Sequence, residues 1–277
     1  MVNLFVVWDV NPVLLNIFGL QIRYYSLSWV LAFVFCAWIF SKMVKREGLN
    51  PKLNDSIFIY ALLSTIIGAR LGHCLFYDPE YYLMHPLEIF MIWEGGLASH
   101  GAAIGMLIGL YLFSKKNKVP YIWTLDRVCV VIPLGGAFIR IGNLFNSEIF
   151  GTATNLPWGF KFVRSMEWQQ MYYDVPVHPT QIYEALLYLI IFAILMFMYF
   201  NRNIAERKPG VIFGWFLVTL FTGRFIIEII KNVQVSFEEA MTLNMGQILS
   251  IPFIIAGIVI LILAYKGRFK TKTASIK

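Results

Sequence analysis

Charged residues are scarce in this chain. Asp, Glu, Lys and Arg together make up 14% of its 277 residues, whereas a soluble domain carries about a quarter. The formal net charge of +7 could suggest nucleic-acid binding, but the basic residues lie in short loops between apolar runs and form no continuous stripe. The composition therefore excludes an ordinary soluble domain, and we expect no nucleic-acid partner.

Cysteine is also rare. The three cysteines, Cys36, Cys74 and Cys129, lie within apolar runs and show no C-x-x-C or His/Cys spacing. This pattern favours buried core thiols and gives no support to a disulfide framework or a metal site. The chain also lacks the H-E-x-x-H, Walker A, G-x-S-x-G and Rossmann sequences. Any chemistry would have to depend on Arg, His, Tyr, Asn and Glu, without a metal or a cofactor.

Long apolar runs, in contrast, are abundant. Hydrophobic residues make up 58% of the chain, and about 20 consecutive apolar residues in a helix span the hydrocarbon core of a bilayer. The pattern predicts an all-α polytopic membrane protein in which residues 1–277 form a single integral membrane domain. The first twenty residues hold no Lys or Arg, so we expect an interfacial arm there and not a signal peptide. Seven transmembrane helices are expected, over residues 24–43, 56–76, 95–114, 121–139, 181–200, 210–230 and 246–265.

The charge of the loops predicts the orientation. Basic residues gather after the first, third and fifth expected spans and in the C-terminal tail, whereas residues 77–94 hold four acidic residues and no Lys or Arg. The positive-inside rule then places the N-terminus outside and the C-terminus inside, which agrees with an odd number of spans. The longest connection, residues 140–180, lies on the outer side. We expect it to form a small extracytoplasmic head segment.

Four cationic or titratable residues lie inside or at the edge of apolar segments: Arg70, His100, Arg140 and Arg224. A charge at the centre of a membrane costs roughly 2.5–3.5 kcal/mol even on the lenient insertion scale. Several such residues indicate an anionic ligand, and the commonest anion in a membrane is a phospholipid phosphate. Arg224 shares a helix face with Glu228, four residues later. The two could form an intramembrane ion pair, or Arg224 could offer its planar fork to phosphate oxygens.

Some of these polar positions also have plain structural interpretations. Arg70 lies late in its expected span and could extend its side chain to the interface. His100 belongs to a segment rich in Gly and Ala, which could simply pack against another helix, although an imidazole with an unperturbed pKa of about 6.5 suits proton transfer. The segment 177–184 is expected to start a helix with Thr180 as its N-cap. Its Tyr183 could order the outer loop over a site.

Six motifs, in order along the chain, resemble those of the bacterial prolipoprotein diacylglyceryl transferases: I-R-Y-Y-S, G-A-R-L-G, G-G-L-A-S-H-G, R-I-G-N-L-F-N-S-E-I-F-G, H-P-T-Q-I-Y-E and G-R-F-I-I-E. The fourth matches the signature of the family. The resemblance implies a seven-span enzyme of the bacterial inner membrane with its active site toward the outer leaflet. Such enzymes transfer the diacylglyceryl group of phosphatidylglycerol to the lipobox cysteine of a prolipoprotein signal peptide and release glycerol phosphate. The implied partners are phosphatidylglycerol, prolipoproteins and membrane lipids.

The resemblance also implies functional residues. Catalytic roles fall on Tyr25, His100, Arg140 and Arg224. The candidate substrate-binding residues, from the resemblance and from the polar positions above, are Asn143, Asn146, Glu148, Gly151, Arg70, Glu228 and Tyr183. His100 is the candidate base for the substrate thiol, and the two catalytic arginines would hold the phosphate charge. Three residues depart from the family pattern, the last of them removing a possible hydroxyl from the site: Ile139, Ala102 and Leu220.

Two other functions stay open from the residues alone. A small anion or lipid transporter could use the same arginines without cleaving anything. A transporter is expected to show paired interrupted helices or repeat symmetry, and the sequence shows neither. A non-catalytic membrane scaffold is the third interpretation. Release of glycerol phosphate that depends on a peptide cysteine would distinguish the transferase from both.

Overall fold

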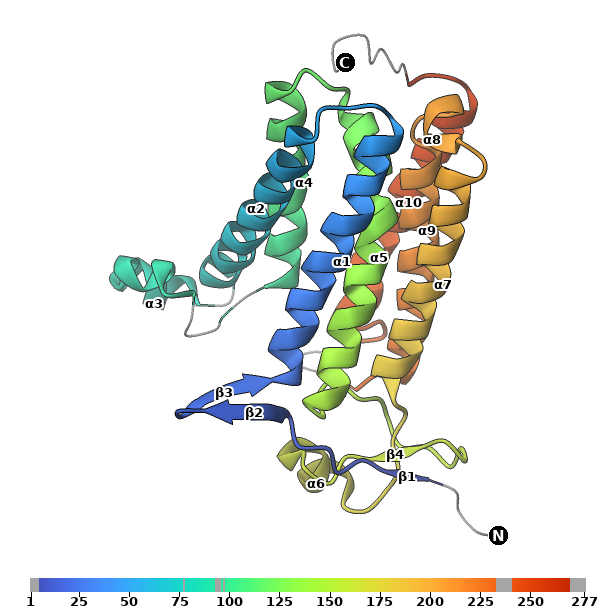
Figure 1. Cartoon of the computed structure of the whole chain (residues 1–277). Coiled ribbons are helices and arrows are strands. Elements are labelled where there is room, and N and C mark those ends of the chain that lie inside the picture. Colours follow the sequence, from blue (N-terminus) through green and yellow to red (C-terminus); the bar gives the residue numbers. More distant parts are fainter. Residues whose placement is uncertain (1–4, 77, 93–95, 97, 233–240, 270–277) are drawn as a thin grey trace. The chain divides into compact units, whose positions relative to one another are not determined.

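The computed structural model describes residues 5–76, 78–92, 96, 98–232 and 241–269, except for the side chains of Leu20, Ser99 and His100. Long helices make up most of this part of the chain (Figure 1). Six of the described helices are long and apolar enough to cross a membrane: α1 (Tyr24–Arg46), α2 (Lys52–Phe76), α5 (Tyr121–Phe145), α7 (Thr180–Phe200), α9 (Val211–Ile227) continued by η3 (Glu228–Ile230), and α10 (Met245–Tyr265). The prediction of a helical, multi-pass membrane protein is confirmed.

The third expected span does not correspond to any of these six helices. Residues 95–114 fall on α4 (Ser99–Lys116), a helix of 18 residues that begins with Ser and His and ends with two lysines. It is not among the six helices that are apolar enough to cross a membrane. The count of seven spans and the orientation in the membrane therefore stay predictions.

The described residues divide into two compact units. The first holds residues 5–38 and the described residues from 128 to 269, and the second holds those from 39 to 127. The boundaries fall within α1 and α5.

In the first unit, α9 packs against both α7 and α10. Two glycines let α9 and α10 approach closely, because a Cβ atom on Gly214 would lie under 3.0 Å from Leu261, and one on Gly257 under 3.0 Å from Leu217. Within the same unit α1 packs along α5, where the Phe35 and Phe138 rings stack with their centroids 5.5 Å apart. The short helix α8 (Ile204–Arg207) joins α7 to α9.

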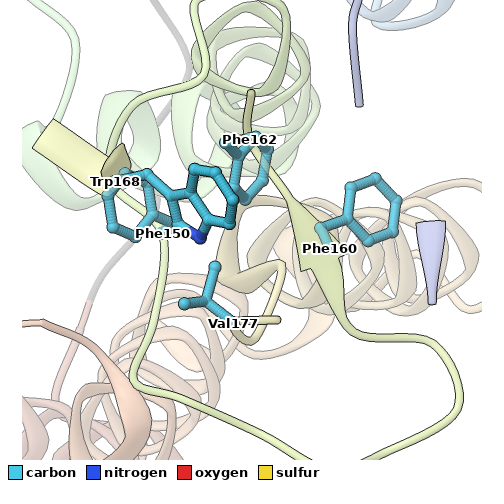
Figure 2. Close-up of a cluster of buried hydrophobic side chains, with 5 residues drawn as sticks. All are labelled: Phe150, Phe160, Phe162, Trp168 and Val177. Atoms are coloured by element: carbon cyan, nitrogen blue, oxygen red, sulfur yellow. The ribbon is translucent and has the colours of Figure 1, made fainter. Parts of the chain in front are cut away.

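The head segment between α5 and α7 has its own small core. Strand β4 (Phe160–Lys161) pairs in parallel with β1 (Val6–Val7) from the N-terminal arm, and α6 (Met166–Tyr172) follows. The buried side chains that fill this core are shown in Figure 2: Phe150, Phe160, Phe162, Trp168 and Val177. The rest of the arm is an antiparallel hairpin of β2 (Val13–Ile17) and β3 (Leu20–Arg23). The N-terminal arm and the segment between α5 and α7 thus form strands and a helix, and their place outside the membrane stays a prediction.

Two helix boundaries differ from the sequence-based expectation. Helix α5 continues to Phe145, so the first six residues of the 140–180 segment are helical and carry the start of the signature on a rigid element. Helix α7 begins at Thr180, after Pro179 as N-cap. The prediction that Thr180 is the N-cap was wrong, because its hydroxyl donates instead to the Ile149 carbonyl at 2.8 Å and ties the signature loop to α7.

In the second unit α2 packs against α4 along a seam of glycines. A Cβ atom on Gly101 would lie under 3.0 Å from the Gly68 carbonyl oxygen, and one on Gly105 under 3.0 Å from that of Ser64. The packing interpretation of the Gly-rich segment is therefore confirmed. After α2 the chain forms the short helices α3 (Pro79–Met84) and η1 (Pro86–Phe90).

Candidate active site

The site begins with Arg140, the first residue of the signature, near the end of α5. Its Nε lies 2.7 Å from a carboxylate oxygen of Glu184. Its Nη1 donates to the Oδ1 of Asn143, one turn later, at 3.3 Å. Glu184 lies in the first turns of α7 and is completely buried. The cation that the sequence singles out is therefore held between an amide of its own helix and a buried carboxylate of another.

Arg224 lies near the end of α9, and its guanidinium is 3.6 Å from Glu228, four residues later. The ion-pair interpretation of these two residues agrees with this distance, and a contact of Arg224 with phosphate stays a prediction. The ammonium of Lys231 lies 3.1 Å from the same Glu228 oxygen and 3.7 Å from Glu184. Arg140, Glu184, Lys231, Glu228 and Arg224 thus form one unbroken series of alternating charges, which we call the charge chain.

The charge chain contains three cations and two carboxylates and so carries one excess positive charge. Its middle is the most buried part: the Glu184 side chain is 0% and that of Lys231 4% exposed. Its two ends are more open, with side-chain exposures of 14% for Arg140 and 28% for Arg224. Neither Glu184 oxygen accepts a well-aligned hydrogen bond from the described residues, so its pairing is mainly coulombic. The accessible groups of the charge chain are therefore guanidiniums.

Glu148 is held beside Arg140 by amides of the signature. Asn143 donates to the Glu148 carboxylate at 2.7 Å and Asn146 at 3.2 Å. Ser147 and Ile149, on the two sides of Glu148, adopt left-handed backbone conformations with φ angles of 56° and 59°. For the β-branched Ile149 this conformation is a genuine outlier, so the backbone beside Glu148 is strained. Strain of this kind persists only where the surroundings enforce it, and it gathers at functional sites.

Two glycines of the signature show why small residues are needed here. A Cβ atom on Gly151 would lie under 3.0 Å from the Ile230 carbonyl oxygen, and Gly151 forms an antiparallel bridge with Lys231. A larger residue at position 151 would push the Lys231 backbone away. On the opposite side, the Tyr25 ring packs against Gly142 on α5, at 3.0 Å from the position of a Cβ atom there.

Tyr183 connects α7 to the head segment. Its hydroxyl accepts a hydrogen bond from the Trp158 indole at 2.9 Å and lies 3.3 Å from His178 Nδ1. Burial lowers the pKa of His178, which favours the neutral ring that can accept a hydrogen bond from the Tyr183 hydroxyl. These contacts tie Tyr183 to the head segment, and its role in ordering that segment over a site stays a prediction.

The remaining two candidates belong to the second unit. The Arg70 guanidinium donates to the carbonyls of Ile89 at 2.9 Å and Glu88 at 2.5 Å and lies 5.0 Å from the Tyr82 ring centroid. These contacts hold the η1 segment against α2, and Arg70 is 3% exposed, so it does not extend to the surface. His100 lies in the first turn of α4, but its side chain falls outside the description.

Sequence reasoning missed Glu184 and Lys231 as site residues. Lys231 could have been found, because residues 224, 228 and 231 follow the i, i+4, i+7 spacing of one helix face. Glu184 was read only as part of a helix start, and no pattern within α7 points to its partners. Among the described residues no group of three His, Cys, Asp or Glu side chains could hold a metal ion.

Comparisons with known proteins identify the family. The family model of prolipoprotein diacylglyceryl transferase matches residues 12–263. The chain is 49% identical to the phosphatidylglycerol–prolipoprotein diacylglyceryl transferase of Porphyromonas gingivalis, over 97% of this chain and 98% of the relative. Proteins of the same name from Bacteroides fragilis and Chloroherpeton thalassium are 42% and 36% identical, over 91% and 98% of this chain and 92% and 98% of the relatives. The chain belongs to the prolipoprotein diacylglyceryl transferase family.

Proposed function

We propose that this chain is an inner-membrane enzyme that transfers the diacylglyceryl group of phosphatidylglycerol to the lipobox cysteine of prolipoproteins and releases glycerol phosphate. The names of its relatives supply the two substrates. The observation that carries the proposal is the charge chain, in which arginines from two helices share one excess positive charge. A phosphodiester headgroup carries one negative charge, so it complements this excess.

The reaction follows from the chemistry of the two substrates. The cysteine sulfur attacks the glycerol carbon that bears the phosphoester; the carbon–sulfur bond forms as the carbon–oxygen bond breaks, and its electron pair leaves with the phosphate. The phosphodiester becomes a phosphomonoester, so negative charge develops on the phosphate oxygens. Arg140 and Arg224 stabilise that charge with donors fixed before the reaction, which is the most effective use of such groups.

A proton must also leave the thiol. A cysteine with a pKa of about 8.5 is mostly protonated at neutral pH, and His100 is the proposed base because neutral imidazole accepts a proton in that range. In the alternative, a phosphate oxygen or water takes the proton and His100 is structural. Replacing His100 by Gln in folded protein separates the two, since near-normal turnover excludes the base role.

The other candidate residues support these groups. We propose that Asn143, Asn146 and Glu148 orient Arg140 and the headgroup, and that Gly151 keeps room for the backbone beside Lys231. Tyr25 would donate a hydrogen bond to substrate or phosphate. Glu228 would position Arg224, and Tyr183 would order the head segment. Arg70 would act indirectly, through the η1 segment that it holds against α2.

We further propose seven membrane spans within one integral membrane domain, with α4 as the third span, the N-terminus outside and the C-terminus inside. The basic loops and tail favour this orientation. It places the signature, the charge chain and the head segment toward the outer leaflet, where a lipobox peptide arrives after translocation.

The test uses the full-length protein in vesicles that contain phosphatidylglycerol. A lipobox peptide is added, and glycerol phosphate release is measured beside a matched peptide in which Ser replaces the Cys. Release that requires the cysteine, with a mass increase of the peptide by one diacylglyceryl group, is the expected result. Movement of lipid or phosphate without peptide modification would instead identify a transporter and overturn the proposal.

A further inference from the structure

Lys231 lies in the middle of the charge chain, between both carboxylates, and no step of the proposed reaction uses it. We propose that Lys231 is a positioning residue that sets the charge of the anion site: it shares Glu184 with Arg140 and is the nearer cation to Glu228, and it thereby leaves Arg224 available for a substrate phosphate. This inference rests on the proposed function and adds a reason why that site binds a phosphodiester.

The count of charges gives the first argument. Without Lys231 the charge chain would reduce to two ion pairs, Arg140 with Glu184 and Arg224 with Glu228, and its net charge would be zero. Each arginine would then face its own carboxylate, which competes with any phosphate for the guanidinium. Lys231 supplies the cation that turns two neutral pairs into a site with an excess positive charge.

The distances give the second argument. At the Oε1 atom of Glu228 the Lys231 ammonium is the nearer cation, at 3.1 Å against 3.6 Å for the Arg224 guanidinium. Arg224 is also the more exposed of the two, with 28% of its side chain accessible against 4% for Lys231. The lysine thus holds the buried carboxylate, while the arginine keeps donors that an incoming anion can reach.

The surroundings fix Lys231 and Glu228 relative to each other. Asn244 donates to the Glu228 carbonyl at 3.0 Å and lies 3.4 Å from its carboxylate. Gly246 leaves no room for a Cβ atom, which would lie under 3.0 Å from the Glu228 carboxyl carbon. On the other side the bridge between Gly151 and Lys231 holds the lysine backbone. The signature glycine therefore acts on the same lysine from the opposite strand.

A purely structural counter-ion is the competing explanation, because a buried ammonium between two carboxylates also stabilises a fold. Burial lowers the pKa of Lys231, so its positive charge is held at a cost. A structural role changes the unfolding temperature but not the lipid dependence of the folded enzyme. A positioning role changes the KM for phosphatidylglycerol and the turnover of protein that is fully folded.

The experiment compares Lys231→Met with the matched control Lys161→Met in the vesicle assay. Lys161 is also nearly buried and pairs with Asp174 at 2.7 Å, but it lies in the head segment outside the charge chain. We expect Lys231→Met to lower kcat/KM for phosphatidylglycerol by about 10- to 100-fold, the effect of losing one charge-assisted contact, and Lys161→Met to leave it within about twofold.

A double variant gives a value of kcat/KM that a purely structural role of Lys231 would not restore. Lys231→Met with Glu228→Gln removes one cation and one carboxylate, so the excess positive charge returns and Arg224 no longer faces the Glu228 carboxylate. We expect its kcat/KM to recover at least tenfold over Lys231→Met. Lys231→Arg, which keeps the charge, should retain most activity. If Lys231→Met does not fold, these two variants carry the test, because neither leaves a buried carboxylate without a counter-charge.

The outcomes separate the two proposals. A wild-type chain that releases no glycerol phosphate with the cysteine peptide overturns the proposed function before any variant is compared. With an active wild type, folded Lys231→Met with unchanged KM and kcat overturns the inference. A folded double variant that stays as inactive as Lys231→Met, or an inactive folded Lys231→Arg, also overturns it, because then the net charge is not what Lys231 supplies.

Discussion

The two units contain arginines of opposite character. In the second unit, Arg127 donates to Glu47 from Nε at 2.9 Å and from Nη2 at 3.2 Å, and its guanidinium lies 4.5 Å from the Trp123 ring centroid. Only 3% of its side chain is exposed. In the first unit, Arg140 and Arg224 are several-fold more exposed, at 14% and 28%.

This difference separates structural from functional cations. The Glu47 carboxylate lies at the edge of the Arg127 guanidinium and the Trp123 ring lies on its face, so these contacts indicate a structural cation and not a ligand site. The two arginines of the charge chain share their carboxylates with a third cation and keep accessible donors. All of them lie in apolar stretches, so hydropathy cannot tell them apart. The distinction depends on how the neighbouring helices neutralise each charge.

The largest expected effect is on Arg140. Arg140→Lys keeps the positive charge but loses the planar fork that reaches both Glu184 and Asn143, so we expect transfer to fall at least about 100-fold, as when one transition-state donor is removed. The measurement is the rate of glycerol phosphate release at saturating peptide.

Arg164→Lys is the matched control for this change. Arg164 also pairs with a carboxylate, that of Asp9, but 44% of its side chain is exposed, and we expect its activity to stay within about twofold of wild type. If Arg140→Lys kept more than a third of the wild-type rate, the fork would not contact the phosphate and the distinction between the two kinds of arginine would fail.

Arg127 should show the opposite pattern, with stability lost and catalysis kept. Arg127→Met removes the guanidinium that faces the Glu47 carboxylate, which we expect to cost about 3 kcal/mol of stability and to lower the unfolding temperature. Combining it with Glu47→Gln should restore most of that loss. Turnover per folded molecule should stay at the wild-type value, and a tenfold loss in folded Arg127→Met would show that Arg127 also serves the site.

Much of the helical framework was predictable because a bilayer imposes a length. The expected span 181–200 differs from α7 by one residue, and the expected span 246–265 differs from α10 by one. The Arg224–Glu228 pair was predictable for the same kind of reason, since both lie on one helix and the α-helical repeat fixes their spacing.

The partners of Arg140 were not predictable in this way. Glu184 reaches the site from α7, and no periodicity within one helix encodes which residues of two helices meet. The role of Gly151 was likewise hidden, because it depends on the Ile230 carbonyl that passes over it. The resemblance named this glycine without supplying a physical reason for it. The catalytic role of His100 stays a prediction.

The glycine seam between α2 and α4 allows a test with a smaller expected effect, on the stability of the second unit. Gly105→Ala places a Cβ atom under 3.0 Å from the Ser64 carbonyl oxygen, a backbone atom that cannot rotate away, so we expect a loss of about 1–3 kcal/mol. Gly135→Ala on α5 is the control, because its nearest neighbour is Cys36 Sγ at 3.4 Å. Thermal unfolding in detergent should separate the two variants. Equal stability would mean that α2 and α4 can move apart without cost.

The smallest expected effect is the pH response of the head segment, which has a titratable residue at its junction with α7. Burial lowers the pKa of His178, so between that lowered value and about 6.5 the unfolded chain binds more protons than the folded one. Stability therefore rises with pH across this window and falls on acidification. Because His178 is partly exposed, solvent screening keeps the effect small, at roughly 1 °C in unfolding temperature.

Tryptophan fluorescence can follow this change, since Trp168 lies in the core of the head segment (Figure 2). Unfolding temperatures at pH 7.5 and 5.5 are compared for the wild type, His178→Gln and the control His85→Gln, which alters an exposed histidine of the second unit. We expect only His178→Gln to reduce the acid sensitivity, because it removes the proton acceptor beside Tyr183. If His85→Gln reduced it equally, the response would not belong to the head segment, and the pH-sensitive contact would have to be sought in the second unit.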